Sequence, residues 1–270
     1  MSDVDGQAGF AEVNGTRLHY EVRGRGPALL FLHGFTLDRR MWKPQIEALA
    51  DRFCVVAYDA RGFGRSGAPG SAPYRHCDDA AALCAHLGLD RVVAVGHSVG
   101  GHQMLELAIE RPDLVAGWAA ICLAGLAGVP FPDEITTLFA AVRRAGVAGR
   151  LDAARERWRQ SAWFTAARET PAVACALDEM IDDYSGWHWQ HDNPAKSLAP
   201  PAAERLGELR IPALVVTGDR DLPYTDVVAS RLVEGIRGAT ALRLPHAGHM
   251  ANLEEPAAVN AALAALAADT

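Results

Sequence analysis

The chain has 270 residues, of which 50% are hydrophobic and 22% are charged. This composition is typical of a globular protein with enough apolar surface to bury a large core. The formal net charge is −7 and runs of Lys or Arg are missing, which argues against nucleic acid and anionic membrane surfaces as partners.

The predicted elements begin with a β-hairpin and continue as alternating strands and helices. Residues 10–22 are expected to form the hairpin, which turns at Asn14-Gly15 and supplies an antiparallel edge. The segments 42–50, 78–86 and 101–110 have helical patterns. Strands are predicted from short apolar runs at 28–32, 53–58, 91–95, 118–123, 212–217 and 241–244. Strands that are apolar on both faces and alternate with helices predict an α/β fold with a mostly parallel, doubly wound sheet.

No strand-like apolar run occurs between residues 125 and 203. This region shows helical patterns and proline-punctuated turns, and the strand pattern resumes at Ile211. A helical insertion within an α/β sheet is typical of a cap or lid. We therefore expect a core formed by residues 1–124 and 204–270, with a helical cap over 125–203. The insertion holds four of the six tryptophans, namely Trp158, Trp163, Trp187 and Trp189.

The segment 96–101, Gly-His-Ser-Val-Gly-Gly, contains the pattern G-x-S-x-G between a predicted strand and a predicted helix. A turn this tight excludes side chains at Gly96 and Gly100 and forces Ser98 into a strained backbone conformation. The serine hydroxyl is then presented above the sheet, and the positive end of the following helix points to the place where an oxyanion would form. The pattern predicts that Ser98 is a nucleophile.

A nucleophilic serine needs a base, and the base needs a group that orients it. His249 follows the predicted strand 241–244, and Asp219 and Asp221 both follow the strand 212–217. Carboxyl ends of strands are where open α/β sheets place their sites. These positions predict His249 as the base and leave either aspartate as its partner.

In combination these motifs resemble the α/β-hydrolase fold family, in its capped subgroup, over nearly the whole chain. The matching segments are His33-Gly34-Phe35, the residues 59–66, Gly96–Gly100, Gly218–Asp221 and Gly248-His249.

The resemblance implies a nucleophilic Ser98, with His249 as general base and then acid and Asp221 rather than Asp219 orienting it. It also implies that the backbone N–H groups of Phe35 and Val99 form the oxyanion hole, while His33 and His97 brace loops.

Two other patterns are weak evidence for a nucleotide site and for a metal site. Gly62-x-Gly64-x-x-Gly67 follows a strand as in dinucleotide-binding sites, but the proline-containing stretch 68–73 follows in place of a helix. The pairs His188/His191 and His246/His249 lack further ligands at metal-site spacing. We expect no cofactor and no metal.

A serine at the nucleophile position argues against epoxide and halide chemistry, for which relatives use an aspartate. The prediction is acyl chemistry on a small-molecule ester, lactone or thioester, with at least one of Trp163 and Trp187 lining the substrate pocket. The stretch Trp163-Phe164-Thr165 loosely resembles enol-lactonases. Carbon–carbon bond hydrolysis, cofactor-free perhydrolysis and a hydrolase-like receptor for a small ligand remain alternatives, and the oligomeric state is open.

Cysteine usage and the start of the chain bear on location. The cysteines at 54, 77, 84, 122 and 175 are odd in number and form no C-x-x-C pair, which favours reduced thiols over a disulfide framework. Residues 1–6 are acidic and lack the apolar stretch of a signal peptide. The longest apolar runs fall short of the roughly 20 residues that span a bilayer. We expect a cytoplasmic protein.

Overall fold

A single mixed sheet runs through the computed structural model, which describes residues 6–270. Residues 1–5, on which the expectation of no signal peptide partly rests, lie outside the described residues. The sheet has eight strands in the order β1-β2-β4-β3-β5-β6-β7-β8. Their bounds are β1 Gln7–Val13, β2 Thr16–Arg23, β3 Ala28–Leu32, β4 Cys54–Tyr58, β5 Val92–His97, β6 Val115–Ile121, β7 Ala213–Gly218 and β8 Thr240–Leu244.

The strand pairing confirms the predicted α/β fold. β1 and β2 form an antiparallel hairpin at one edge, and all strands from β3 to β8 pair in parallel. The hairpin turns where expected, because Asn14 and Gly15 both have positive φ angles, of 47° and 69°, as a tight hairpin turn requires. The central strands β3, β5, β6 and β7 are buried along their whole length, which explains why their sequences are apolar on both faces.

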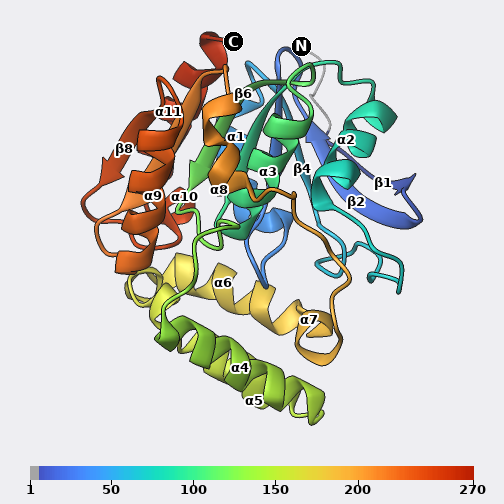
Figure 1. Cartoon of the computed structure of the whole chain (residues 1–270), viewed down its shortest axis with the longest axis vertical. Helices are drawn as coiled ribbons and strands as arrows, with labels where there is room; N and C mark the ends of the chain where they lie inside the picture. Colours follow the sequence, from blue (N-terminus) through green and yellow to red (C-terminus); the bar gives the residue numbers. More distant parts are fainter. Residues whose placement is uncertain (1–5) are drawn as a thin grey trace.

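Helices cover both faces of the sheet. Figure 1 shows α2, α3, α8 and α9 in front of the strands, whereas α1 and α10 lie behind them and pack with α11. The helix bounds are α1 Lys43–Leu49, α2 His76–Leu87, α3 Val99–Glu110, α4 Asp133–Val147, α5 Leu151–Arg159, α6 Pro171–Asp183, α7 Trp187–Gln190, α8 Ala202–Arg205, α9 Pro223–Gly235, α10 Ala251–Glu254 and α11 Pro256–Ala268.

Among the parallel strands, β6 differs most from its sequence-based bounds. β6 begins at Val115 and ends at Ile121, whereas the apolar pattern predicts a strand over 118–123. The first three residues of this strand include Ala116 and Gly117, which are weak strand formers. Parallel pairing of Gly117 with Val93 of β5 nevertheless brings this segment into the sheet, with Ala116 at a register shift, so tertiary context overrides local preference.

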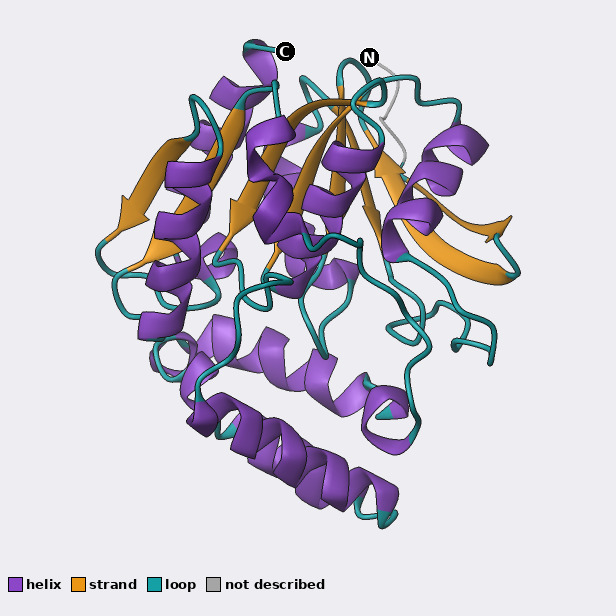
Figure 2. Cartoon of the chain, viewed as in Figure 1, coloured by secondary structure: helices purple, strands orange, loops and turns teal. Residues whose placement is uncertain are grey.

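Four helices between β6 and β7 stand apart from the sheet layers. We call α4, α5, α6 and α7 the α4–α7 segment (residues 133–190). In Figure 2 the arrowheads of the parallel strands point toward the side on which this segment lies. The region 125–203 is helical as expected, and its one strand-like contact among the described residues is a single bridge between Ala195 and Tyr74. The segment therefore lies over the carboxyl ends of the strands.

Candidate active site

Ser98 occupies a sharp turn between β5 and α3. Its backbone has φ 53° and ψ −124°, outside the regions that side chains favour, which costs about 1–3 kcal/mol and persists where the surroundings enforce it. A Cβ atom at Gly96 would lie 2.3 Å from the backbone of Gly100, and one at Gly100 would lie 2.4 Å from the carbonyl oxygen of His33. The two glycines are therefore required for the turn, as the sequence pattern predicts.

His249 and Asp221 reach Ser98 from two other loops. His249 Nε2 lies 3.0 Å from Ser98 Oγ, and His249 Nδ1 lies 2.8 Å from Asp221 Oδ2. The loops follow β8 and β7, so all three side chains come from carboxyl ends of neighbouring strands. An ionised carboxylate on Nδ1 fixes the tautomer in which Nδ1–H donates and Nε2 accepts. This arrangement lets Nε2 receive the serine proton.

The structure separates the two candidate aspartates. Asp221 has its side chain buried against His249, and its Oδ1 accepts the N–H of Leu222 at 2.7 Å. Asp219, two residues earlier, is more exposed and forms an ion pair with Arg243. Only Asp221 of the pair therefore contacts the imidazole.

Two further histidines support the surrounding loops. His97 Nε2–H donates to the carbonyl oxygen of His249 at 2.7 Å, and His33 bridges the carbonyl oxygen of Gly34 and the N–H of Ala60, at 2.7 and 3.0 Å. Burial lowers the pKa of His33 and, more strongly, the pKa of His97. Both rings are therefore neutral hydrogen-bonding groups near pH 7.

Phe35 and Val99, whose backbone N–H groups are predicted to bind the oxyanion, both lie beside Ser98. Phe35, in the loop after β3, and Val99, the first residue of α3, line the same cavity as Ser98. Within residues 6–270 neither N–H donates to a protein acceptor. Unpaired N–H groups beside a nucleophile are the donors that an oxyanion requires.

The cavity beside Ser98 has a volume of about 170 Å³ and is mainly apolar. Its walls come partly from the core loops and partly from the chain between β6 and β7. The aromatic members of the second group are Phe131, Phe139, Trp158, Trp163 and Phe164. The sequence singles out Trp163 among these, but the spacing of the aromatic residues does not reveal that the other four face Ser98.

The two tryptophans predicted to line the pocket have different positions. The ring of Trp163 lies against His249, with centroids 4.3 Å apart, and lines the cavity. Trp187 stacks on His191 at 5.1 Å and does not contribute to the cavity walls. Of the pair, only Trp163 therefore lies at the site.

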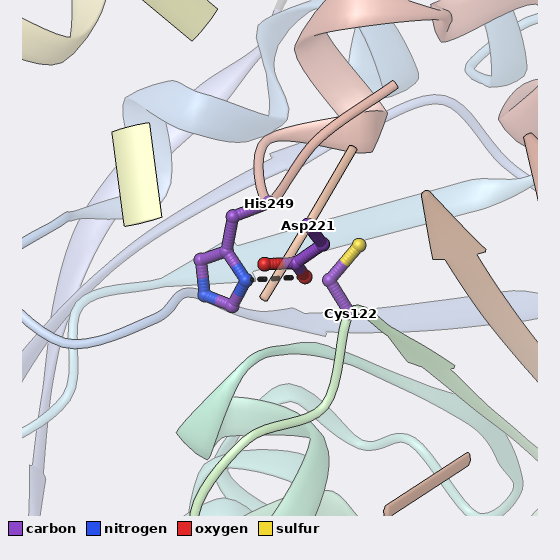
Figure 3. Close-up of side chains that lie close together, drawn as sticks. All are labelled: Cys122, Asp221 and His249. Carbon is purple, nitrogen blue, oxygen red and sulfur yellow. Dashed lines mark hydrogen bonds and ion pairs between the residues drawn. The ribbon is translucent and has the colours of Figure 1, made fainter. Parts of the chain in front are cut away.

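Cys122 lies beside the aspartate, and Figure 3 shows the Asp221 carboxylate between the ring of His249 and the side chain of Cys122. The potential ligand atoms of these three residues lie within 4.8 Å of one another. However, Cys122 Sγ–H donates to the carbonyl oxygen of Gly248 at 3.4 Å, and burial together with Asp221 raises the pKa of the thiol well above its ordinary value. A cysteine binds a metal as the thiolate. A protonated Cys122 that is hydrogen-bonded to Gly248 therefore fits a structural role in this loop better than a role as a metal ligand.

No helix within residues 6–270 combines the length and the apolar character needed to cross a membrane.

Comparisons with known proteins identify relatives over most of the chain. A protein of Rhizobium rhizogenes (strain K84 / ATCC BAA-868) is 33% identical over 264 residues, covering 90% of this chain and 95% of the relative. Its name, carbamate hydrolase RutD, is itself a provisional assignment.

Two solved structures show the same fold. The enol-lactonase from Burkholderia xenovorans LB400 has 26% identity and a TM-score of 0.76, and covers 96% of this chain and 99% of its own. A malate-bound thermophilic esterase from Thermogutta terrifontis has 26% identity and a TM-score of 0.71, with 96% and 97% coverage. The family model described as "Alpha/beta hydrolase family" matches residues 29–262, and the chain therefore belongs to the alpha/beta hydrolase family and is a hydrolase.

Proposed function

We propose that the protein is a serine hydrolase that cleaves a carboxylic ester or lactone of a small molecule. The observation that carries this proposal is the hydrogen-bonded chain from Ser98 Oγ through His249 to Asp221, with distances of 3.0 and 2.8 Å. A serine in contact with an oriented base is the arrangement that acyl transfer needs. No cofactor enters this chemistry.

The reaction would proceed in two halves. His249 Nε2 takes the proton of Ser98 as Oγ attacks the substrate carbonyl carbon, and the carbonyl oxygen becomes an oxyanion between the N–H groups of Phe35 and Val99. The carbon–oxygen bond to the leaving group then breaks, and His249 gives its proton to the departing oxygen. Water, deprotonated by His249, attacks the acyl-enzyme, and the second tetrahedral oxyanion collapses to release the acid and return the proton to Ser98.

The cavity supports a small substrate. A volume of about 170 Å³ holds a short acyl group and little more, and its aromatic walls favour apolar carbon chains. The α4–α7 segment supplies several of those walls, so we propose that residues 125–203 act as a cap on a core formed by 1–124 and 204–270. The named relatives include an enol-lactonase and an esterase, which supports oxygen leaving groups.

A carbamate is the second candidate substrate class, because a relative with 33% identity over nearly the full length carries that name. The same three residues would attack a carbamate carbonyl. Carbamates are less electrophilic than esters, so the two substrates give different rates at one site.

The location in the cell stays a prediction. The five cysteines are free thiols, which agrees with a reducing compartment such as the cytoplasm.

The test compares hydrolysis of p-nitrophenyl acetate and butyrate by wild type, Ser98→Ala and Ser71→Ala. Ser71 is an exposed serine away from the cavity and serves as the matched control. We expect Ser98→Ala to lose turnover while keeping the melting temperature of wild type, and Ser71→Ala to keep both. Retained turnover in purified Ser98→Ala would overturn the assignment.

A fluorophosphonate probe gives an independent readout, since it phosphonylates an activated serine without needing the natural substrate. Mass spectrometry should find the added mass on the peptide that contains Ser98. Absent labelling of folded wild type would shift the interpretation toward a ligand-binding protein, whereas labelling without ester turnover would favour carbamate or carbon–carbon substrates.

A further inference from the structure

A second cavity adjoins the one at Ser98 and is larger, with a volume of about 670 Å³. The two cavities meet at Val99, Gly125 and Phe131, which line both. Because Val99 follows the proposed nucleophile directly, a substrate held at Ser98 lies beside this junction. The smaller cavity accommodates only a short group, so the rest of a longer substrate needs space of this kind.

The second cavity has polar side chains on part of its wall, whereas the first is almost entirely apolar. Its floor is the side of α3 that carries His102, Gln103 and Glu106, and His76 of α2 lines it as well. The connection after α7 contributes Asn193, Ala195, Lys196 and Ser197, and the apolar part of the lining comes from Val99 and residues 125–131. The side chains of Gln103, Lys196 and Ser197 offer hydrogen-bond donors to a polar substrate group.

The two charged side chains that line this cavity, Glu106 and Lys196, differ in whether they can bind a substrate group. Glu106 is buried, its Oε1 accepts the N–H of Leu198 at 2.8 Å, and the same oxygen lies 3.3 Å from His102 Nε2. Its negative charge is therefore engaged by protein donors. Lys196 is exposed, and among residues 6–270 its ammonium forms no ion pair. The available charge is thus positive.

The remaining titratable group does not alter this balance. Burial lowers the pKa of His76 to about 3, so the ring is neutral at physiological pH and contributes a hydrogen-bonding nitrogen rather than a charge.

From this juxtaposition we propose that the second cavity is a subsite for a carboxylate on the substrate, bound by Lys196, which lines this cavity but not the one at Ser98. The substrate class is then a half-ester of a short dicarboxylic acid. The apolar cavity holds the carbon chain beside Ser98, and the second cavity holds the free carboxylate at its polar side chains. This inference rests on the proposed function for the scissile bond but not for the binding of the carboxylate.

The first experiment measures binding without catalysis. The Ser98→Ala protein is titrated calorimetrically with dicarboxylates of four to eight carbons and with monocarboxylates of the same lengths. The comparison separates the effect of the second carboxylate on affinity from the effect of the carbon chain of the ligand. We expect one dicarboxylate length to bind about fivefold more tightly than its monocarboxylate partner, the effect of one partly exposed ion pair. Equal affinity at every length would overturn the subsite.

The second experiment measures selectivity. For each variant, kcat/KM is taken for the monoethyl ester of the preferred dicarboxylic acid and for the ethyl ester of the matching monocarboxylic acid. Because the ratio is formed within one variant, a general loss of activity cancels. We expect Lys196→Gln to abolish the preference and Lys196→Glu to reverse it, chiefly through KM.

The chain offers a matched control, since Lys43 is its only other lysine. Lys43 is exposed and lies in α1, away from both cavities, so Lys43→Gln and Lys43→Glu should keep the wild-type ratio. A ratio that is the same in wild type and in both Lys196 variants would contradict the proposal. If wild type hydrolyses neither ester, the proposed function fails. The calorimetric titration alone then tests whether the second cavity binds a carboxylate.

Discussion

Trp158 of α5 donates its indole N–H to the hydroxyl of Thr36 at 2.6 Å, and both side chains are buried. Thr36 follows Phe35, whose N–H is proposed to hold the oxyanion. A β-branched residue rarely has a positive φ, yet Thr36 has φ 64°, and its hydroxyl also donates to the carbonyl oxygen of Phe35 at 2.6 Å. A helix of the α4–α7 segment is therefore hydrogen-bonded to the strained loop that carries the proposed oxyanion donor.

Replacing Trp158 with phenylalanine should weaken the oxyanion hole and leave the aromatic packing largely intact. We expect kcat to fall about tenfold with a small change in KM, because the hydrogen bond positions Phe35 in the transition state rather than in substrate binding. Steady-state kinetics on p-nitrophenyl butyrate measure the split. Trp187→Phe, on α7 and outside the cavity, is the control and should match wild type. A rise in KM alone would assign Trp158 to the pocket wall only.

The two aspartates of the loop after β7 give a paired test. Asp221→Asn should lower kcat by about 10³-fold or more, because an amide no longer fixes the His249 tautomer or stabilises the imidazolium. Asp219→Asn removes only a partly exposed ion pair with Arg243 and should change kcat by less than about twofold. Equal effects of the two substitutions on ester turnover would contradict the assignment of Asp221.

Ester turnover should fall as the pH is lowered from 8 to 5. His249 must be neutral to accept the proton of Ser98, and histidines commonly titrate in this range. Burial holds the pKa of His33 and His97 below its ordinary value, so these neighbours stay neutral and do not contribute a second transition. A pH–rate profile of kcat/KM checks this expectation, and a profile that is flat over the range would argue against a histidine base.

Glu254 predicts a pH-dependent stability. Burial raises the pKa of this carboxyl above its ordinary value of 4.5, although its Oε2 accepts the N–H of Gly248 at 2.8 Å. A raised folded-state pKa favours folding below about pH 4.5 and loses that contribution as the pH rises. Glu254→Gln, which stays neutral, should therefore melt about 2 °C above wild type at pH 8 and equal to it near pH 4. Thermal unfolding at the two pH values measures the difference, and a larger gain at pH 4 would show that the sign is wrong.

The residues that sequence reasoning located share one property, which is that their positions follow from local geometry. Ser98 is predictable because a tight strand-to-helix turn admits only glycine at 96 and 100. His249 is predictable because it follows a strand that must end at the same sheet edge. Asp221 needed the family resemblance, since two aspartates two residues apart satisfy the same positional argument, and the structure distinguishes them by the partner each one reaches.

The pocket walls were harder to predict. Phe139 and Trp158 lie on helices whose orientation over the sheet is set by packing, and no local pattern in the sequence encodes that orientation. Trp163 and Trp187 have equally suggestive positions in the sequence, yet one faces His249 and the other packs against His191. The Thr36 conformation is equally hard to predict, because its hydroxyl is hydrogen-bonded to a partner 122 residues away in the chain.

The contact between Trp158 and Thr36 also limits how this scaffold can be re-engineered. The α4–α7 segment carries none of the three proposed catalytic side chains, so exchanging it for the equivalent segment of a relative looks like a simple way to change substrate preference. The donated segment would, however, have to bring its own hydrogen-bond donor to Thr36, or the strained loop beneath it would relax. Exchange of the α4–α7 segment is therefore constrained by one atom, the indole nitrogen of Trp158 in α5.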